Sequence, residues 1–159
     1  MAVVSAQTTP FDRETRALLH VIMIDFEAKK YDAALAKLSG LEKKYPGDPF
    51  ILNLLGAVHT RKKDYANARR YFDLSLEKQP DFFPAKFNLG ELLFLQRQYA
   101  ESLGFFREMQ QADPTNELLQ FKVFLCLFKM DDSEGTEKAM KKIRYPGDTP
   151  AWYYAQAAL

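Results

Sequence analysis

Two consecutive stretches of the chain decide the fold. Residues 49–80 read PFILNLLGAVHTRKKDYANARRYFDLSLEKQP, and residues 83–114 read FPAKFNLGELLFLQRQYAESLGFFREMQQADP. When the first stretch is laid over the second, the same residue types fall on the same positions. Chance rarely aligns so many positions at one offset, so the chain contains an internal repeat. The aligned sets, at one constant spacing, are Tyr31, Tyr65 and Tyr99; Ala34, Ala68 and Ser102; Pro46, Pro80 and Pro114; Leu55 and Leu89; Gly56 and Gly90; and Phe72 and Phe106.

Each repeat is predicted to form two antiparallel helices. The eight prolines, at 10, 46, 49, 80, 84, 114, 146 and 150, all lie at repeat boundaries, where a missing N–H group does not interrupt a helix. Asp48-Pro49 and Thr149-Pro150 each place an N-cap residue before a proline at the first helical position. Short polar turns separate the two helices of a unit and force them to lie antiparallel. These turns are Lys29-Lys30, Lys63-Asp64, Arg97-Gln98 and Asp131-Asp132.

Small residues at fixed positions predict close packing within each unit. Gly56 and Gly90 lie midway along the first helix of their units, and Ala34, Ala68 and Ser102 lie early in the second. Small residues that face each other let two helices approach to the low end of the usual distance of about 8–10 Å. No unit can bury its apolar face alone, so neighbouring units are expected to stack.

A helix–turn–helix unit of about 34 residues with Leu55-Gly56, Tyr65, Ala68, Phe72 and Pro80 resembles the tetratricopeptide repeat. The next unit carries a matching set, and the resemblance extends over about residues 14–159. It implies an all-α, right-handed solenoid of antiparallel helix pairs, with four repeats and the first helix of a fifth. We therefore expect a flexible segment at 1–11 and a repeat domain at 12–159. The expected repeats are about 14–48, 49–82, 83–116 and 117–148, with a partial unit at 149–159.

The end of the chain departs from the regular spacing. Pro146 comes two residues earlier than the spacing of Pro46, Pro80 and Pro114 requires, which implies a shortened second helix or a shortened turn. Trp152 then falls where the family usually places its tryptophan. Trp152, Tyr153 and Tyr154 would belong to a helix without its partner helix. Either the natural protein continues beyond Leu159 or two chains cover each other there, so self-association through these three residues is one expectation.

Composition limits the classes of function. The chain has 159 residues, 47% hydrophobic and 27% charged, which is typical of one globular domain. Lys+Arg 22 minus Asp+Glu 21 leaves a net charge of +1, which argues against nucleic acid and against a membrane surface as partners. The first six residues, MAVVSA, are either a frayed terminus or the remnant of a signal peptide. The compartment, cytoplasmic or exported, therefore stays open.

The sequence shows no constellation of catalytic or metal-binding residues. His20 and His59 lie in first helices of different units without metal-ligand spacing, and packing or solvent exposure explains them. Cys126 lies in an apolar stretch and is expected to be a small core residue. We expect no enzymatic activity and no metal or cofactor.

The resemblance places a partner-binding groove on the inner face of the first helices, which in such stacks holds an extended or helical peptide. Phe87, Phe94, Phe121, Leu125 and Phe128 would form a contiguous apolar strip, and an exposed strip of this kind usually marks an interaction site. Core packing, a groove for an apolar ligand and self-association all remain open for it. The groove positions carried over are Leu19, Asn53, Phe87 and Phe121; Phe26, Thr60, Phe94 and Phe128; and Met23, Ala57, Glu91 and Leu125.

These patterns together predict a scaffold or adaptor that binds a protein or peptide partner in an apolar concave groove. The partner's identity is not specified by the sequence. The alternative is a structural module whose groove is filled by its own chain or by an identical one.

Overall fold

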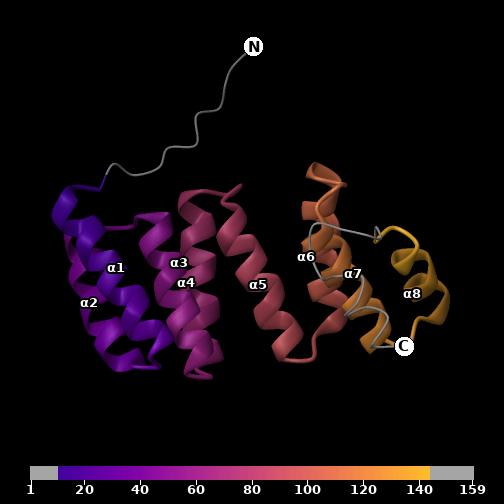
Figure 1. Ribbon diagram of the computed structural model, residues 1–159, viewed down its shortest axis with the longest axis horizontal. Helices are drawn as coiled ribbons and strands as arrows, with labels where there is room; N and C mark the ends of the chain where they lie inside the picture. Colours follow the sequence, from indigo (N-terminus) through magenta and orange to yellow (C-terminus); the bar gives the residue numbers. More distant parts are fainter. Residues whose placement is uncertain (1–10, 144–159) are drawn as a thin grey trace, which may run out of the picture. The chain divides into compact units, whose positions relative to one another are not determined.

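The computed structural model describes residues 11–143, which form eight helices joined by short connections (Figure 1). No strand occurs within this range, and the predicted all-α fold of helix pairs is confirmed. The predicted fifth unit, with Trp152, Tyr153 and Tyr154, lies outside the described residues. The helices are α1 (Arg13–Glu27), α2 (Tyr31–Lys44), α3 (Pro49–Arg61), α4 (Tyr65–Lys78), α5 (Phe83–Leu95), α6 (Tyr99–Ala112), α7 (Glu117–Lys129) and α8 (Ser133–Met140).

The helices begin where the sequence places helix-starting residues. The side chain of Asp48 accepts hydrogen bonds from the backbone N–H groups of Phe50 and Ile51, at 3.0 and 3.1 Å, directly before Pro49. Acidic or amide side chains cap α1, α4, α7 and α8 in a similar way. Helix α8 has 8 residues, whereas α2, α4 and α6 each have 14. The early Pro146 is therefore accompanied by a short second helix in that unit.

The turn within each helix pair has the same backbone conformation in all four pairs. One residue per turn adopts a positive φ, between 57° and 64°, which is the left-handed conformation that often ends a helix. The next residue donates its backbone N–H to a carbonyl oxygen near the end of the first helix, for example Gln98 to Leu93 at 2.9 Å. None of the four positive-φ residues is glycine, although a side chain at such a φ adds strain. They occupy equivalent positions of the four units and are Lys29, Lys63, Arg97 and Asp131.

Glycine in the first helix makes room for a phenyl ring from the second. A Cβ atom built on Gly56 would lie 2.5 Å from Cε1 of Phe72, and one on Gly90 would lie 2.9 Å from Cζ of Phe106. Both rings are almost completely buried. A large ring therefore fills the space that each missing side chain leaves, which we did not expect. At Gly90 the expected small residue also lies close, since the hydroxyl of Ser102 donates a hydrogen bond of 2.8 Å to the Gly90 carbonyl oxygen.

The chain divides into two compact units, each described here by itself. Unit 1 (Met1–Phe82) contains α1–α4, and unit 2 (Phe83–Leu159) contains α5–α8. The core of unit 1 includes Ile22, Leu38, Leu55 and further aliphatic residues. The core of unit 2 is built from α6, α7 and the region of α8, with buried Phe106, Leu119 and Phe124. Within residues 11–143, no helix has the length and apolar character needed to cross a membrane.

The described part of the N-terminal segment includes Phe11, which corrects one expectation. The flexible segment predicted from the sequence extends to residue 11. The ring of Phe11 instead packs edge-on against Tyr45, with ring centroids 5.1 Å apart, and lies 6.0 Å from the ring of Phe50. Its carbonyl oxygen accepts a hydrogen bond of 2.7 Å from Arg16. Aromatic packing thus holds the chain in place one residue before the cap of α1.

Gly56→Ala is expected to lower the free energy of unfolding by about 1–3 kcal/mol, because the added methyl group overfills a closed core at Phe72. Gly104 is the matched control, since a Cβ there meets no atom within 4 Å. Gly104→Ala should instead stabilise by up to about 1 kcal/mol through helix propensity. Urea unfolding of both variants checks this, and equal stabilisation by the two substitutions would contradict the glycine–phenyl contact.

Arg97→Gly is expected to stabilise the protein by roughly 0.5–1 kcal/mol, because glycine relieves the strain of a positive φ at a small entropic cost. Gln96→Gly provides the control, since Gln96 is exposed in the same turn and is not among the positive-φ residues. That control should destabilise. Thermal melts of the two variants give opposite shifts if the turn has the conformation described.

Candidate functional site

In unit 2, the first helices of two successive repeats present their predicted groove residues with matching spacing. On α5 these are Phe87, Glu91 and Phe94, and on α7 they are Phe121, Leu125 and Phe128. Each set is spaced i, i+4, i+7, which places its members on one side of a helix. All six side chains are partly buried. We call this set of six residues the α5–α7 face.

The aromatic rings of the α5–α7 face rest on the core of unit 2. Phe87 packs edge-on against buried Phe106, with centroids 5.6 Å apart. Phe121 and Phe128 each stack on buried Phe124 at 6.2 Å. The strip that we expected to be exposed is therefore half-buried, because each ring turns one side to the core. Each of these side chains therefore packs against the core on one side and keeps an accessible surface on the other.

An ion pair crosses the middle of the α5–α7 face. Lys122 on α7 lies 2.8 Å from the carboxylate of Glu91 on α5, and its Nζ lies 5.9 Å from the centre of the Phe87 ring. Both side chains of the pair are shielded, with 18% and 34% of their surface exposed. We did not predict Lys122 at this surface. Its position corresponds to Asn88 of the preceding repeat, so the repeat pattern offered no signal for it.

A cavity of about 410 Å³ adjoins the end of the α5–α7 face at Phe128. Its apolar lining comes from Phe128 and Met140, and charged side chains form part of its rim. A concavity of this size accommodates one or two side chains of a ligand. Its lining residues are Phe128, Asp131, Ser133, Thr136, Glu137, Met140 and Lys141.

The corresponding face of unit 1 is less apolar. On α1, Met23 is exposed, whereas Leu19 and Phe26 are partly buried against the core. The guanidinium of Arg61 covers Phe26 at 5.4 Å from the ring centre. Asn53 on α3, which we expected to line the groove, is only 6% exposed. Helix α3 is contacted by both α2 and α4, and this enclosure leaves Asn53 little surface for a partner.

The two other expected groove positions of α3 are also partly enclosed. Ala57 and Thr60 are both partly buried. The hydroxyl of Thr60 donates a hydrogen bond of 2.9 Å to the carbonyl oxygen of Gly56 within its own helix. This hydrogen bond satisfies the hydroxyl, so Thr60 adds little polar recognition to the face of unit 1.

His20 is exposed, whereas His59 has structural partners and Cys126 is buried. Nδ1 of His59 lies 3.0 Å from the carboxylate of Asp64, and its ring stacks on Tyr71 at 5.4 Å. Hydrogen bonds from Asn67, and to a smaller extent from His59, lower the pKa of Asp64. Cys126 is completely buried, and burial raises the pKa of its thiol. Residues 11–143 contain no group of histidine, cysteine and acidic side chains that could hold a metal ion.

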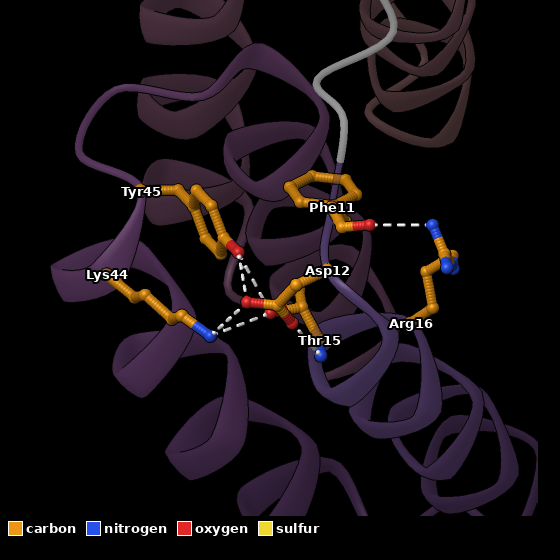
Figure 2. A network of polar contacts seen from close by, with 6 residues as sticks. All are labelled: Phe11, Asp12, Thr15, Arg16, Lys44 and Tyr45. Carbon is orange, nitrogen blue, oxygen red and sulfur yellow. Dashed lines mark hydrogen bonds and ion pairs between the residues drawn. The ribbon is translucent and has the colours of Figure 1, made fainter.

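Polar contacts tie the start of α1 to the end of α2 (Figure 2). The carboxylate of Asp12 accepts hydrogen bonds from the backbone N–H of Thr15 at 2.7 Å, from Lys44 at 2.8 Å and from the hydroxyl of Tyr45 at 3.2 Å. The buried hydroxyl of Thr15 shares a hydrogen bond of 3.0 Å with that of Tyr45. The bond from Lys44, followed by that from Thr15, holds the pKa of Asp12 well below its usual range. This network fixes the position of α1 against α2.

Comparison with known proteins gives a family match and several structural neighbours. The family model described as "Tetratricopeptide repeat" matches residues 23–82 and 75–117. The structure of MamA from Desulfovibrio magneticus RS-1 is similar with a TM-score of 0.71 and 21% sequence identity, over 83% of this chain and 75% of that one. PilW, described as a type IV pilus biogenesis factor, is similar with a TM-score of 0.76 and 19% identity, over 90% and 67%. YrrB, described as having an unusual peptide-binding site, has a TM-score of 0.67 and 16% identity, over 89% and 74%.

Asp12→Asn is expected to lower the melting temperature at neutral pH, and this difference from wild type should shrink as the pH falls below about 4. The reason is that a carboxylate whose pKa is lowered by folding stabilises above its unfolded-state pKa and loses that contribution as it becomes protonated. Melting curves across this pH range measure the effect. Asp81→Asn, at an exposed position, is the control. A constant difference at all pH values would contradict the role given to Asp12.

Proposed function

Because the chain belongs to the tetratricopeptide repeat family, whose members bind protein or peptide partners, we propose that it is a scaffold or adaptor that holds a peptide or helix of a partner against the α5–α7 face. The family is in general a non-catalytic interaction module. The proposed function is accordingly binding without catalysis, with no metal or cofactor. The face of unit 1, with Leu19, Met23, Phe26 and Asn53, is assigned a lesser part because Arg61 and burial reduce its apolar surface.

One observation carries this proposal: half-buried aromatic side chains line one side of α5 and of α7, and one of them, Phe128, also lines a cavity. Phe128 stacks on Phe124 and also lines the cavity, and Phe94 packs edge-on against Tyr99 at 5.1 Å. Rings that are already held by the core lose little freedom when a ligand covers their other side. Aromatic anchors of this kind commonly supply most of the binding energy at interfaces.

The positions of the side chains on the α5–α7 face also predict the spacing and polarity of the side chains in the segment that it would bind. Phe87 and Phe94 are seven residues apart on α5, which corresponds to about 10 Å along the helix axis. The ion pair of Glu91 and Lys122 lies between them. A matching segment would carry two apolar side chains about 10 Å apart, which is two turns of a helix, with a polar side chain between them that reaches the ion pair. A third apolar side chain would enter the cavity at Phe128.

The alternative is a structural module whose α5–α7 face is filled by its own chain or by an identical one. The half-buried state of the six residues is compatible with this alternative as well. The two functions differ in whether an external peptide competes for the face. A direct selection of ligands therefore separates them.

Selection of peptides from a random library against the full chain tests the proposal. We expect the selected peptides to carry apolar side chains two helical turns apart and to bind the double variant Phe94→Ala/Phe128→Ala at least tenfold more weakly than wild type. A tenfold loss corresponds to about 1.4 kcal/mol. Isothermal titration calorimetry of one selected peptide gives the affinities. Circular dichroism of each variant confirms that its helices are intact.

Phe105→Ala on α6 is the matched control. Phe105 is also partly buried but lies on a second helix, outside the α5–α7 face. The control variant should bind the selected peptide as wild type does. Equal binding to all three proteins would place the peptide elsewhere and overturn the proposed site. Failure to select any peptide, together with self-association that the double variant abolishes, would support the structural module instead.

A further inference from the structure

Helix α1 carries an apolar row on the side that faces away from the core. Ala17, Val21, Ile24 and Ala28 are spaced i, i+4, i+7, i+11 and so share one side of the helix. All four are exposed, with 42% of Val21 and 55% of Ile24 accessible. The opposite side of α1 is buried through Thr15 and Ile22. We call these four residues the outer row.

The same positions are core positions in other first helices. In the next repeat, Ala17, Val21 and Ile24 correspond to Ile51, Leu55 and Val58 of α3, which are at most 2% exposed. The equivalent residues of α7 are Leu119, Val123 and Cys126, which are also buried. The residues of α3 pack in a core with residues of α1 and α2, which are the preceding helix pair. The residues of α7 pack in a core with residues of α6, which is the second helix of the preceding pair. The outer row therefore has the composition of a buried interface.

The outer row is complementary to itself. An antiparallel second copy of α1, related by a two-fold axis between Ile22 and Met23, would place Ala17 opposite Ala28 of the second copy and Val21 opposite Ile24 of the second copy. The two alanine layers at the ends allow the helices to approach closely, and the branched residues fill the centre. A two-fold interface requires such a match of a surface with its own inverse.

The polar side chains beside the outer row agree with the same pairing. His20 and Glu27 are exposed, lie seven residues apart and therefore flank the row on one side. In the antiparallel arrangement, His20 lies beside Glu27 of the second copy, and the two-fold axis repeats this pair at the other end. Complementary flanking groups of this kind contribute to the pairing of helices.

We propose that the outer row of α1 is a homodimer interface in which two copies of the chain pair antiparallel through Ala17, Val21, Ile24 and Ala28. The network of Asp12, Thr15, Lys44 and Tyr45 fixes α1 on α2 (Figure 2), so the row is presented on a rigid helix.

One helix pair buries less than the roughly 1,200 Å² of a stable interface, and the dimer is therefore weak and concentration-dependent. The dimer would present two α5–α7 faces, and a ligand with two binding segments would gain avidity from it.

Sedimentation velocity of the full chain over a range of concentrations provides the first test. We expect a monomer–dimer equilibrium, and Ile24→Glu should weaken it at least tenfold. Leu95→Glu is the control, because Leu95 on α5 is equally accessible at 54% and lies outside the outer row. A chain that stays monomeric at every concentration, or a dimer that Ile24→Glu leaves unchanged, would overturn the proposal. The first result would mean that the row is covered within one chain, and the second that another surface associates.

Disulfide cross-linking tests the orientation. In the antiparallel pair, identical residues at position 17 are about 16 Å apart, which is too far for a disulfide. Ala17→Cys alone and Ala28→Cys alone should therefore stay uncrosslinked under oxidation, whereas an equimolar mixture of the two should form covalent dimers. Wild type is the background control, since Cys126 is completely buried. Cross-linking of each single variant with itself, or none in the mixture, would contradict the antiparallel pair.

The two proposals fail in distinguishable ways. A selected peptide with one binding segment should bind Ile24→Glu as tightly as wild type, because the outer row lies on unit 1 and the α5–α7 face lies on unit 2. Loss of the dimer with intact peptide binding supports the interface at α1. Loss of peptide binding in Phe94→Ala/Phe128→Ala with an intact dimer supports the proposed function and shows that the dimer does not depend on the α5–α7 face.

Discussion

The contact between a phenyl ring and bare glycine backbone determines how the helices of the two middle repeats pack. Phe72 on α4 occupies the space at Gly56, and Phe106 on α6 occupies the space at Gly90. Because a methyl group would collide with the ring, the two helices can lie this close only where the first carries glycine. In the second of these pairs, the hydroxyl of Ser102 also donates a hydrogen bond of 2.8 Å to the carbonyl oxygen of Gly90.

The outer helix pairs carry residues of other sizes at the positions where the middle repeats carry glycine and phenylalanine. Where the first helix carries Ile22 in place of glycine, the second carries Leu38 in place of phenylalanine, and both are buried in the core of unit 1. Where α7 carries Phe124, α8 carries Met140, which packs against the core of unit 2. A larger residue on one helix is thus accompanied by a smaller or more adaptable one on the other. Cores tolerate such exchanges when the total volume is conserved.

The surfaces of the first helices follow from this packing together with the turns. The residue with a positive φ in each turn reverses the direction of the chain, so the second helix packs antiparallel against one side of the first. The residues on the remaining sides of the first helices are then the ones available to partners. On α5 and α7 these are half-buried aromatic and aliphatic side chains around one ion pair. On α1 they include an apolar row that the described residues leave exposed.

The sequence by itself determined the repeat period, the helix pairs and their polar turns, because these features depend on local propensity and spacing. That phenyl rings fill the space at Gly56 and Gly90 was decided by the tertiary structure. The sequence did not predict that Lys122 bridges to Glu91, that Asn53 is enclosed, or that Phe121 and Phe128 stack on Phe124. Only the tertiary structure decided which of the residues at equivalent repeat positions are exposed. Val21, Leu55 and Val123 occupy equivalent positions, yet only the latter two are buried. The physical reason is that burial depends on which helix packs alongside, and the periodicity of one helix carries no information about its neighbour.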